Sequence, residues 1–397
     1  MAYKEKTLVI IVKMKNHGPL FLVCIFWLMI VSCNRNSEER QSSELIDIQI
    51  DSLKSLFEIP AIAYGVIRND TIILQKAIGF RDIKLKNKVQ INDLFHIGSN
   101  TKAFTSFLAA KIVEQNLITW DTKFFDLYPE LKGESNPAYE NICLKELLSH
   151  RARLIPFKDE LYPIADYEKD LNKDLALNKK RYLFIKQVLK YEPIPLYDHP
   201  DDRYSNAGYI AAALMLEKVT GQTWEELINN MSNELNLGIY VGWPDDSNQE
   251  SPKGHIKPKE WFIDMDEELI PIPQVLKRYH NFNQFILLCN PSGNLSISLP
   301  DFLGYLRLNI DGLNGKNNYL KSETYKDIFY SYPDYSCGWM NENYFVPCFH
   351  HKGSASTFSS IAIIEPVKKV GIVVMMNVAN GEAINEISKI LINKYAR

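Results

Sequence analysis

Ser99 and Lys102 have the spacing of a nucleophilic serine and its base, and Ser99 is the only serine followed three residues later by a lysine. Apolar residues at 104, 107, 108 and 112 predict a helix that begins near Ser99, with Lys102 one turn further on the same face. An amine whose pKa is lowered by burial can take the serine proton, and helix N–H groups can stabilise an oxyanion. A helix cap followed by a surface lysine also fits the motif, so further elements must decide.

Tyr204 and Asn206 form a second candidate element on a loop before a long apolar stretch. In an extended turn, two side chains at this spacing can face the same side. A phenol beside a buried ammonium can pass a proton to a leaving group, and an amide can hold a substrate carbonyl. A packed tyrosine followed by a capping asparagine gives the same pattern, so the motif gains weight only together with the others.

A third element, at His351, Gly353 and Ser354, is expected on a strand near the end of the chain. Alternate strand residues face opposite sides, so only one of His350 and His351 can line a site, and their divergence argues against a metal site. Gly353 allows a substrate backbone to approach closely. The N–H of Ser354 would complete an oxyanion hole with that of Ser99.

The elements that must position these residues follow from hydrophobic patterns. Strands are expected at 61–67, 71–79, 359–364 and 370–376, paired as two hairpins, and helices at 45–57, 209–219 and 383–391. Strands at both chain ends predict an α+β fold, in which one antiparallel sheet built from both ends is flanked by helices. The expected sheet lobe comprises about 45–98 and 286–397, and an inserted, mostly helical lobe comprises about 99–285. A cleft between lobes is a favoured place for a site.

Composition excludes little but constrains the partners. At 397 residues the chain can bury a large core, and its net charge of −3 gives no argument for a nucleic-acid partner. The sequence predicts no metal or cofactor, because it contains no zinc-type spacing. Cys143, Cys289, Cys337 and Cys348 could pair in an exported protein, but their spacing specifies no connectivity.

Residues 1–33 predict an export signal, because a basic start precedes an apolar run at 20–31 that is too short for a comfortable membrane span. The pattern at 30–33 resembles a bacterial lipobox. This resemblance implies lipidation of Cys33, a polar tether at 34–44 and a lipid anchor at the periplasmic side of a bacterial membrane. A simple cleaved signal or an uncleaved anchor is the alternative interpretation.

The three motifs, in this order, resemble the serine β-lactamase and penicillin-binding-protein superfamily. The similarity is to the branch with class C β-lactamases, D-alanyl-D-alanine carboxypeptidases and related esterases, the peptidase S12-type serine hydrolases. The branch has S-x-x-K, then Y-x-N, then K-T-G or H-x-G, here Ser99 and Lys102, Tyr204 and Asn206, and His351 and Gly353. Further similar segments lie at 79–82, 93–98, 147–150 and 337–339, so the resemblance covers about 45–397.

The resemblance implies acyl transfer through a covalent acyl-enzyme on Ser99. Either Lys102 or Tyr204 takes the hydroxyl proton, and the sequence leaves this choice open. Asn206 and His351 are expected to hold the substrate, His351 through a carboxylate. H-x-G in place of K-T-G favours a peptidase or esterase over an efficient β-lactamase, and an export signal favours a D-amino-acid peptide, such as one derived from peptidoglycan.

Three departures from the branch pattern bear on the choice of substrate and on activity itself. Arg151 and Arg153 stand where T-S-G is usual, Thr357 replaces a common glycine, and 201–203 replace the usual P-G. The two arginines would either attract an anionic substrate or form a solvated charged loop. The departures at 151–153 motivate the alternative of a catalytically silent binding or sensing protein on the same fold.

Overall fold

The computed structural model describes residues 44–157, 174–196, 198–247, 250–256, 270–271, 287–355 and 357–397. The chain divides into two compact units, Met1–Asp51 and Ser52–Arg397, and the candidate site lies in the second. The helix expected at 45–57 is observed at 44–56. The export signal with Cys33 and the tether up to residue 43 lie outside the described residues.

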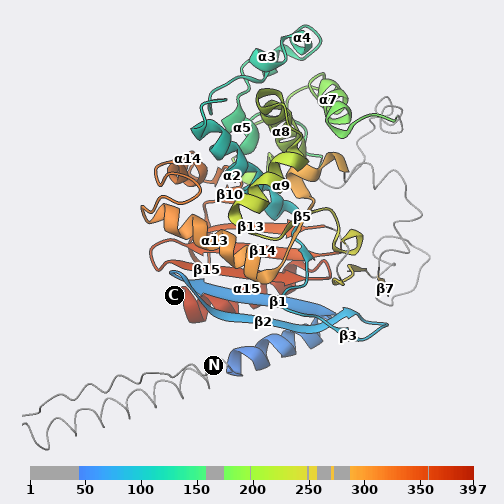
Figure 1. The fold of residues 1–397 in the computed structure, drawn as a ribbon, viewed down its shortest axis with the longest axis vertical. Coiled ribbons are helices and arrows are strands. Elements are labelled where there is room, and N and C mark those ends of the chain that lie inside the picture. Colours follow the sequence, from blue (N-terminus) through green and yellow to red (C-terminus); the bar gives the residue numbers. More distant parts are fainter. Residues whose placement is uncertain are drawn as a thin grey trace, which may run out of the picture. The chain divides into compact units, whose positions relative to one another are not determined.

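An antiparallel sheet built from both ends of the second unit forms its centre (Figure 1). In spatial order its strands are β3 (Asn87–Lys88), β2 (Thr71–Asp82), β1 (Ala61–Arg68), β15 (Val370–Met376), β14 (Ser359–Glu365), β13 (Phe349–Ser354), β10 (Trp339–Met340) and β9 (Tyr335–Ser336). β1 pairs directly with β15, with Ile62 opposite Met376. The early and late strands therefore meet inside the sheet, and the predicted α+β fold is confirmed.

Both predicted hairpins are present, and their turns lie against each other. The β1–β2 turn contains Asn69 and the β14–β15 turn contains Lys369, both with a positive φ, which tight turns of this kind require. The N–H of Asn69 donates to the carbonyl of Lys369 over 2.9 Å. This contact ties the two ends of the chain together at one end of the sheet.

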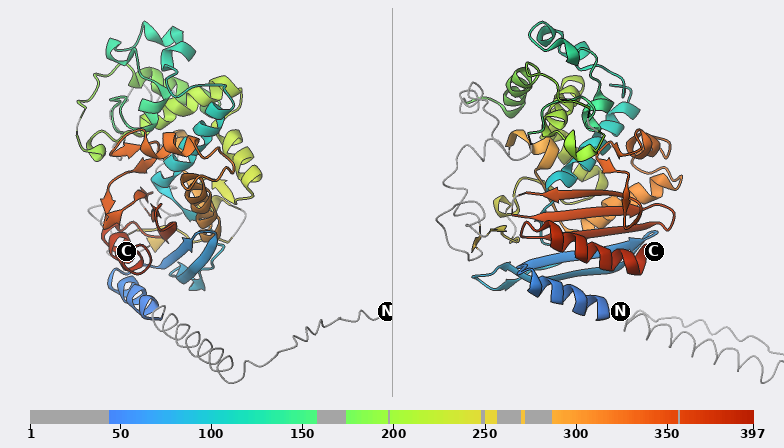
Figure 2. Two further views of the ribbon diagram at one scale, coloured as in Figure 1. Left: turned by 90° about the vertical axis from the view of Figure 1, so that its left-hand side faces the viewer. Right: turned by 180° about the vertical axis from the view of Figure 1, so that it is seen from behind.

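Helices cover both faces of the sheet (Figure 2). α13 (Leu299–Leu313) contacts β1 and β15, while α15 (Gly381–Tyr395) contacts β14 and β15 from the opposite face. Every residue of β14 and β15 is therefore buried. Continuous burial explains why these strands are apolar throughout rather than alternating.

Most of the remaining described helices lie in the insert between the two groups of strands. They are α2 (Thr101–Glu114), α3 (Phe124–Leu127), α4 (Pro129–Lys132), α5 (Leu144–Leu148), α7 (Leu177–Val188), α8 (Asn206–Thr220) and α9 (Trp224–Leu235), with α12 (Asn290–Gly293) and α14 (Thr324–Tyr330) later in the chain. Short 3₁₀ turns are η1 (Gly98–Asn100), η2 (Pro137–Tyr139), η3 (Pro200–Asp202) and η4 (Pro244–Asp246). α8 contains the buried helix predicted at 209–219, and Gly221 caps it with a φ of 73°.

The short strands form smaller sheets. β4 (Phe95–His96), β8 (Leu295–Ile297) and β5 (Ile239–Val241) make a three-stranded sheet, and the two-stranded pairs are β6 (His255–Ile256) with β7 (Ile270–Pro271) and β11 (Asn343–Tyr344) with β12 (Val346–Pro347). The stretch 240–275 lies partly outside the described residues. β4 and β8 bring the segment before Ser99 beside the segment after α12.

The helix that follows Ser99 is more deeply buried than its spacing predicts. In α2, residues 101–110 are all buried, including Lys102, Thr105 and Ser106. A helix that is buried all round belongs to the interior, whereas an amphipathic helix lies on a surface. Lys102 therefore lies in the core of the molecule and not at its surface.

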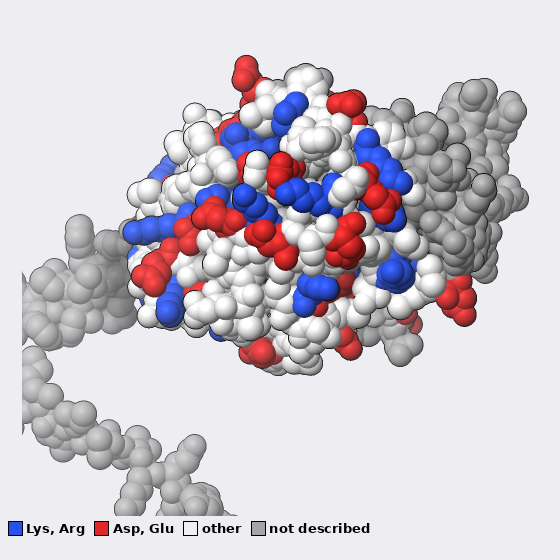
Figure 3. All heavy atoms as spheres, turned by 90° about the horizontal axis from the view of Figure 1, so that it is seen from above, with Lys and Arg blue, Asp and Glu red and all other residues white. Residues whose placement is uncertain are grey.

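The surface carries mixed charges. On the face shown in Figure 3, acidic and basic side chains are interspersed, as expected for a chain with a net charge of −3. Among the described residues, no helix combines the length and apolar character needed to cross a bilayer.

Candidate active site

Ser99 lies in η1, the single turn that leads into α2, and is partly exposed. Lys102 lies in the first turn of α2 and is completely buried. Its Nζ is 3.3 Å from the Oγ of Ser99. The structure thus brings the predicted hydroxyl and amine together at the start of a helix, with the amine on the protein side and the hydroxyl at the surface.

Two glycines allow β13 to approach this turn closely. Gly98 has a φ of +50°, and a Cβ on it would lie 2.7 Å from the backbone nitrogen of Ser354. A Cβ on Gly353 would lie 1.9 Å from the carbonyl oxygen of Ile97. The backbone of Ser354 therefore lies beside the residue that precedes Ser99, where the sequence places the second N–H of an oxyanion hole.

Replacing Gly353 with alanine is expected to destabilise the protein by about 2 kcal/mol or more, because the new methyl group collides with fixed backbone. Urea unfolding followed by circular dichroism measures this loss. Gly133→Ala is the matched control, since a Cβ there meets nothing within 4 Å. Equal midpoints for the two variants would contradict the close approach of β13.

The surroundings of Lys102 fix where its lone pair can point. Nζ is 2.7 Å from Oδ1 of Asn206 and 2.6 Å from the carbonyl oxygen of Ser292, and both of these atoms can only accept hydrogen bonds. Burial lowers the pKa of Lys102 well below its ordinary value, which favours the neutral amine. A neutral amine has two hydrogens for these two acceptors, so its lone pair is left for the hydroxyl of Ser99.

Tyr204 lies against the same amine. The Nζ of Lys102 is 4.5 Å from the centroid of the Tyr204 ring. His150 supports this loop, because its ring lies 4.2 Å from the Tyr204 ring and its Nδ1 accepts the N–H of Ser205 over 3.1 Å. Ser205 in turn caps α8 through Gly208. The Y-x-N segment is thus held by the helix that it begins.

Both ends of the Asn206 amide are engaged. Oδ1 accepts from Lys102, and Nδ2 donates to the carbonyl oxygen of Phe157 over 2.5 Å. The observed contacts make Asn206 a partner of the lysine. The substrate contact expected from the sequence stays a prediction, because a substrate carbonyl would have to replace Phe157 at Nδ2.

His351 is buried on the site side of β13, with its ring centroid 6.2 Å from that of Tyr204. His350 faces the other side and stacks on Tyr344 at 4.6 Å, as strand alternation predicts. Nδ1 of His351 is 2.7 Å from the carbonyl oxygen of Lys352, which can only accept, so Nδ1 carries the proton. Nε2 then accepts the hydroxyl hydrogen of Tyr335, 3.1 Å away.

This arrangement bears on the expected role of His351. Burial lowers the pKa of His351 to about 3, so its ring is neutral near neutral pH. A substrate carboxylate could reach Nε2 only by displacing Tyr335, and it would meet a lone pair rather than a cation. Recognition of a carboxylate by His351 therefore stays a prediction without support from the observed contacts.

The two arginines that depart from the branch pattern have partners within the chain. Arg151 pairs with Asp334 at 2.7 Å, and its guanidinium lies 4.1 Å above the Tyr332 ring. Asp334 also pairs with Arg203, which immediately precedes Tyr204. Arg153 donates to the carbonyl of Ile194 over 2.8 Å. These cations hold loops around the site, which gives the departure a structural reason.

One important neighbour of Lys102 could not be found from the sequence. The carbonyl oxygen of Ser292 belongs to the backbone, and every residue type offers the same carbonyl, so no side-chain motif marks it.

The four cysteines for which the sequence left pairing open, Cys143, Cys289, Cys337 and Cys348, are free thiols.

Comparisons with known proteins bear on the family and the fold of this chain. Residues 51–396 match the Beta-lactamase family. Among curated proteins, Protein flp of Staphylococcus aureus strain MRSA252 is 23% identical over 343 residues, which is 85% of this chain. The chain spans 63% of the length of that relative. The Unguisins hydrolase ungD of Aspergillus violaceofuscus is 26% identical over 177 residues, 43% of this chain and 29% of the relative.

Two solved structures share the fold at low sequence identity. The octameric penicillin-binding protein homologue from Pyrococcus abyssi superposes with a TM-score of 0.68 at 19% identity, covering 89% of this chain and 78% of that one. A structure described as SurE with D-Leu gives a TM-score of 0.65 at 14% identity, covering 89% and 74%.

Proposed function

The chain belongs to the Beta-lactamase family, and from this premise we propose that it is a serine hydrolase that forms an acyl-enzyme on Ser99. The observation that carries the proposal is the contact between Ser99 and Lys102. A completely buried amine lies 3.3 Å from the hydroxyl, with its two hydrogens directed to other acceptors. This is the geometry in which an amine can act as a base toward a serine.

In the proposed reaction, the Oγ of Ser99 attacks a substrate carbonyl carbon while its proton passes to the Nζ of Lys102. The N–H groups of Ser99 and Ser354 stabilise the oxyanion. When the bond to the leaving group breaks, the leaving group takes a proton through Tyr204. Water then attacks the carbonyl carbon of the acyl-enzyme. Its proton passes through the site to the Oγ of Ser99, and the acid and free Ser99 are released.

We propose that the substrate is a D-amino-acid peptide, an ester or a β-lactam-like amide. One similar protein is named a hydrolase, which supports hydrolysis, and another is described in a structure with D-Leu, which supports a D-amino-acid substrate. A peptidase or esterase agrees better than an efficient β-lactamase with histidine at the first position of the third motif. The departures at 151–153 that motivated the alternative of a silent binding protein have a structural explanation, since Arg151 and Arg153 have partners within the chain.

Intact-mass measurement after incubation with a penicillin, a short chromogenic ester and a D-alanyl-D-alanine peptide tests the proposal. An added mass equal to the acyl group, with a lifetime that depends on the compound, is expected. Its lifetime ranks the substrates, because a good substrate deacylates quickly and a poor one stays bound. No added mass and no product with any of the three would contradict the proposal.

Tyr204→Phe is expected to lower kcat about 100-fold or more, because the variant loses the hydroxyl that passes protons but keeps the ring that packs on His150. Hydrolysis of the chromogenic ester measures this effect. Tyr182→Phe is the matched control, since its hydroxyl contacts only the exposed Glu130 in the described structure. An unchanged kcat in Tyr204→Phe would remove the phenol from the mechanism.

We also propose that the protein is exported and anchored by a lipid on Cys33. The support is the sequence pattern before the described residues, and the resulting location would place the site beside peptidoglycan. Metabolic labelling with a lipid precursor tests this, because the label should appear on the natural protein and be absent from Cys33→Ala.

A further inference from the structure

One hydroxyl of the central sheet reaches the turn that carries Ser99. Ser360 of β14 lies directly opposite Gly353 of β13 in the sheet register. Side chains at directly opposite positions share a face of the sheet, and Gly353 has no side chain to fill that space. A Cβ on Gly353 would lie 2.6 Å from the Oγ of Ser360 and 1.9 Å from the carbonyl oxygen of Ile97. The hydroxyl of Ser360 therefore reaches the turn through the space that the glycine leaves.

Ser360 is hydrogen-bonded to both ends of this turn. Its Oγ donates to the carbonyl of Ile97 over 2.7 Å and accepts from Nδ2 of Asn100 over 2.7 Å. These directions are fixed, because a carbonyl can only accept and a hydroxyl has one hydrogen to give. The oxygen of Ser360 is then left for an N–H donor, so Asn100 must present its NH₂. Ile97 precedes the Gly98–Ser99 pair and Asn100 follows it, so one hydroxyl spans the turn.

The amide of Asn100 is kept at a cost in stability. Asn100 and Ser360 are both buried. Oδ1 of Asn100 has no hydrogen-bond partner among the described residues, and a buried polar atom in this state costs free energy. Residues that carry such a cost are expected at sites of function. The half of the amide that makes a contact is its NH₂, which holds Ser360.

The other hydrogen bonds of the turn give it its shape. Thr101 donates from Oγ1 to the carbonyl of Gly98 over 2.7 Å, and the N–H of Asn100 donates to the carbonyl of Ile97 over 3.2 Å. The N–H of Ile97 donates to Leu295 of the three-stranded sheet over 2.9 Å. Within the described ranges, the hydrogen bonds from residues 97–101 to the central sheet are the two made by its β14 serine.

β13 carries the second N–H of the proposed oxyanion hole. The N–H of Ala355 donates toward β14, to the carbonyl of Phe358 over 3.1 Å. Successive N–H groups of a strand point to opposite edges, so that of Ser354 points away from β14. The turn lies beside it, since a Cβ on Gly98 would be 2.7 Å from the nitrogen of Ser354. The distance between the N–H groups of Ser99 and Ser354 therefore depends on how the turn is held against the sheet.

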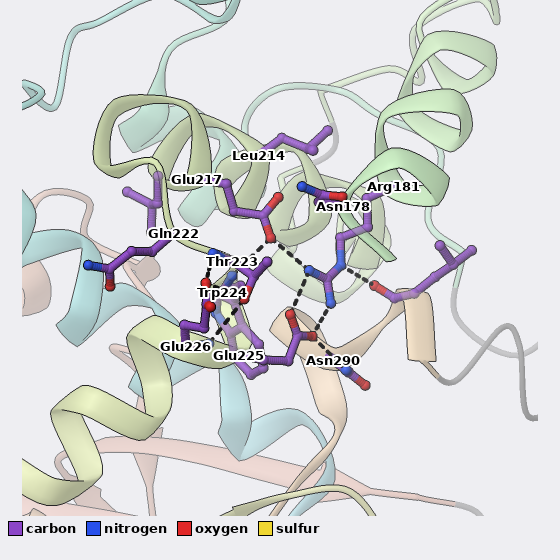
Figure 4. Close-up of polar contacts among 12 residues, drawn as sticks. Asn178, Arg181, Leu214, Glu217, Gln222, Thr223, Trp224, Glu225, Glu226 and Asn290 are labelled. Atoms are coloured by element: carbon purple, nitrogen blue, oxygen red, sulfur yellow. Dashed lines mark hydrogen bonds and ion pairs between the residues drawn. The ribbon is translucent and has the colours of Figure 1, made fainter. Parts of the chain in front are cut away.

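The candidate base is held from another side. The carbonyl of Ser292 in α12 accepts from the Nζ of Lys102 over 2.6 Å. Asn290, the first residue of α12, donates to Glu225 of α9 over 2.7 Å, and Glu225 pairs with the buried Arg181 of α7 (Figure 4). These contacts involve no residue of β14, so a change on that strand should leave the surroundings of the base intact.

We propose that Ser360 and Asn100 are positioning residues, which hold the turn against the sheet and so set the width of the oxyanion hole between the N–H groups of Ser99 and Ser354. Their effect on rate rests on the proposed acyl transfer by Ser99. Their effect on local opening of the turn does not, because the two hydrogen bonds are present whether or not the serine reacts.

Ser360→Ala tests the proposal against Ser359→Ala. Ser359 is the neighbouring buried serine, and its Oγ accepts the N–H of Asn380, which begins the helix on the opposite face of the sheet. Stopped-flow acylation by the chromogenic ester should be about 10-fold or more slower in Ser360→Ala than in Ser359→Ala. The ester concentration that gives half the maximal rate should change less than about 3-fold, because the oxyanion forms only in the transition state. Equal acylation rates in the two folded variants would overturn the proposal.

The pH dependence of acylation separates an effect on the oxyanion hole from an effect on the base. The pH of half-maximal rate should be the same in Ser360→Ala and in the natural protein, because the acceptors of Lys102 are Asn206 and Ser292. A change of more than about one pH unit would place the effect on the base and overturn the proposal.

A double-mutant cycle tests whether the two residues act through one contact. Asn100→Ala should also slow acylation, because the turn loses one of its two bonds to the sheet. Asn100→Ala combined with Ser360→Ala should be no more than about 3-fold slower than Ser360→Ala alone. Losses that multiply in full would overturn the joint role. If Ser360→Ala does not fold, Asn100→Ala takes its place in the comparison with Ser359→Ala.

Hydrogen exchange gives a readout that is independent of activity. The N–H of Asn100 donates to the carbonyl of Ile97, so a loosened turn should exchange this proton faster. Mass spectrometry of peptides that cover 97–101 should show exchange about 10-fold or more faster in Ser360→Ala than in the natural protein and in Ser359→Ala. Unchanged exchange would overturn the inference, whereas a natural protein that never acylates would overturn only the proposed function.

Discussion

Replacing Ser99 with alanine is expected to abolish the acyl-enzyme and to lower turnover of an ester or peptide on the order of 10⁴-fold or more. The reason is that the structure directs the lone pair of Lys102 to the Oγ of Ser99 at 3.3 Å. Labelling with a fluorophosphonate probe, followed by intact-mass measurement, reports the covalent step directly.

The control for Ser99→Ala is Ser388→Ala. Ser388 is a buried serine on α15 whose Oγ donates to the carbonyl of Ile384, and this pair is separate from the contacts of Lys102. The control variant should label as the natural protein does. A covalent adduct on Ser99→Ala would show that another residue is the nucleophile, and the proposed mechanism would then fail.

Replacing Lys102 is expected to lower the acylation rate about 10³-fold. Alanine removes the base. Arginine is permanently protonated and cannot accept a proton, so Lys102→Arg should be as slow as Lys102→Ala. Lys111→Arg is the matched control on the same helix, because Lys111 is only partly buried and donates to the carbonyl of Tyr319. Activity in Lys102→Arg close to that of the natural protein would exclude the lysine as the base.

The role of Lys102 as the base also predicts a pH dependence for acylation by the natural protein. The base is the neutral amine, so acylation should be slow where Lys102 is protonated and should rise as pH increases through its pKa. Burial lowers that pKa well below the ordinary value of a lysine, so the rise should occur at a lower pH than a solvent-exposed lysine would give. A rate that rises only near the pKa of an exposed lysine would contradict a neutral amine at neutral pH.

Local sequence patterns were sufficient to predict the hairpins and helix ends of the fold. The hairpins around Asn69 and Lys369 and the helix that ends at Gly221 lie where the pattern predicted them, because turns and helix ends are decided by neighbouring residues. The pairing of the first strands with the last followed from their position at both ends of an apolar pattern. The family of the chain could likewise be inferred from three short motifs in the right order.

The environment of each side chain could not be predicted in this way. The sequence placed Lys102 on a helix face, but only the packed structure shows that the helix is buried on all sides. The sequence presented Arg151 either as a cation that attracts an anionic substrate or as part of a solvated charged loop, and the structure pairs it with Asp334 from a distant segment. His351 was expected to bind a carboxylate, and Tyr335 occupies the nitrogen that would serve.

The sequence by itself determined which chemical groups this protein has, on which elements they lie, and in what order. The tertiary structure decided the protonation states of these groups and the directions of their hydrogen bonds. It buries the amine of Lys102, places the proton of His351 on Nδ1, and brings the carbonyl of Ser292, which no sequence motif marks, to Lys102. The physical reason is that a pKa and a hydrogen-bond direction depend on desolvation and on partners far away in the chain. Neither is set until α2, α12 and β13 pack together.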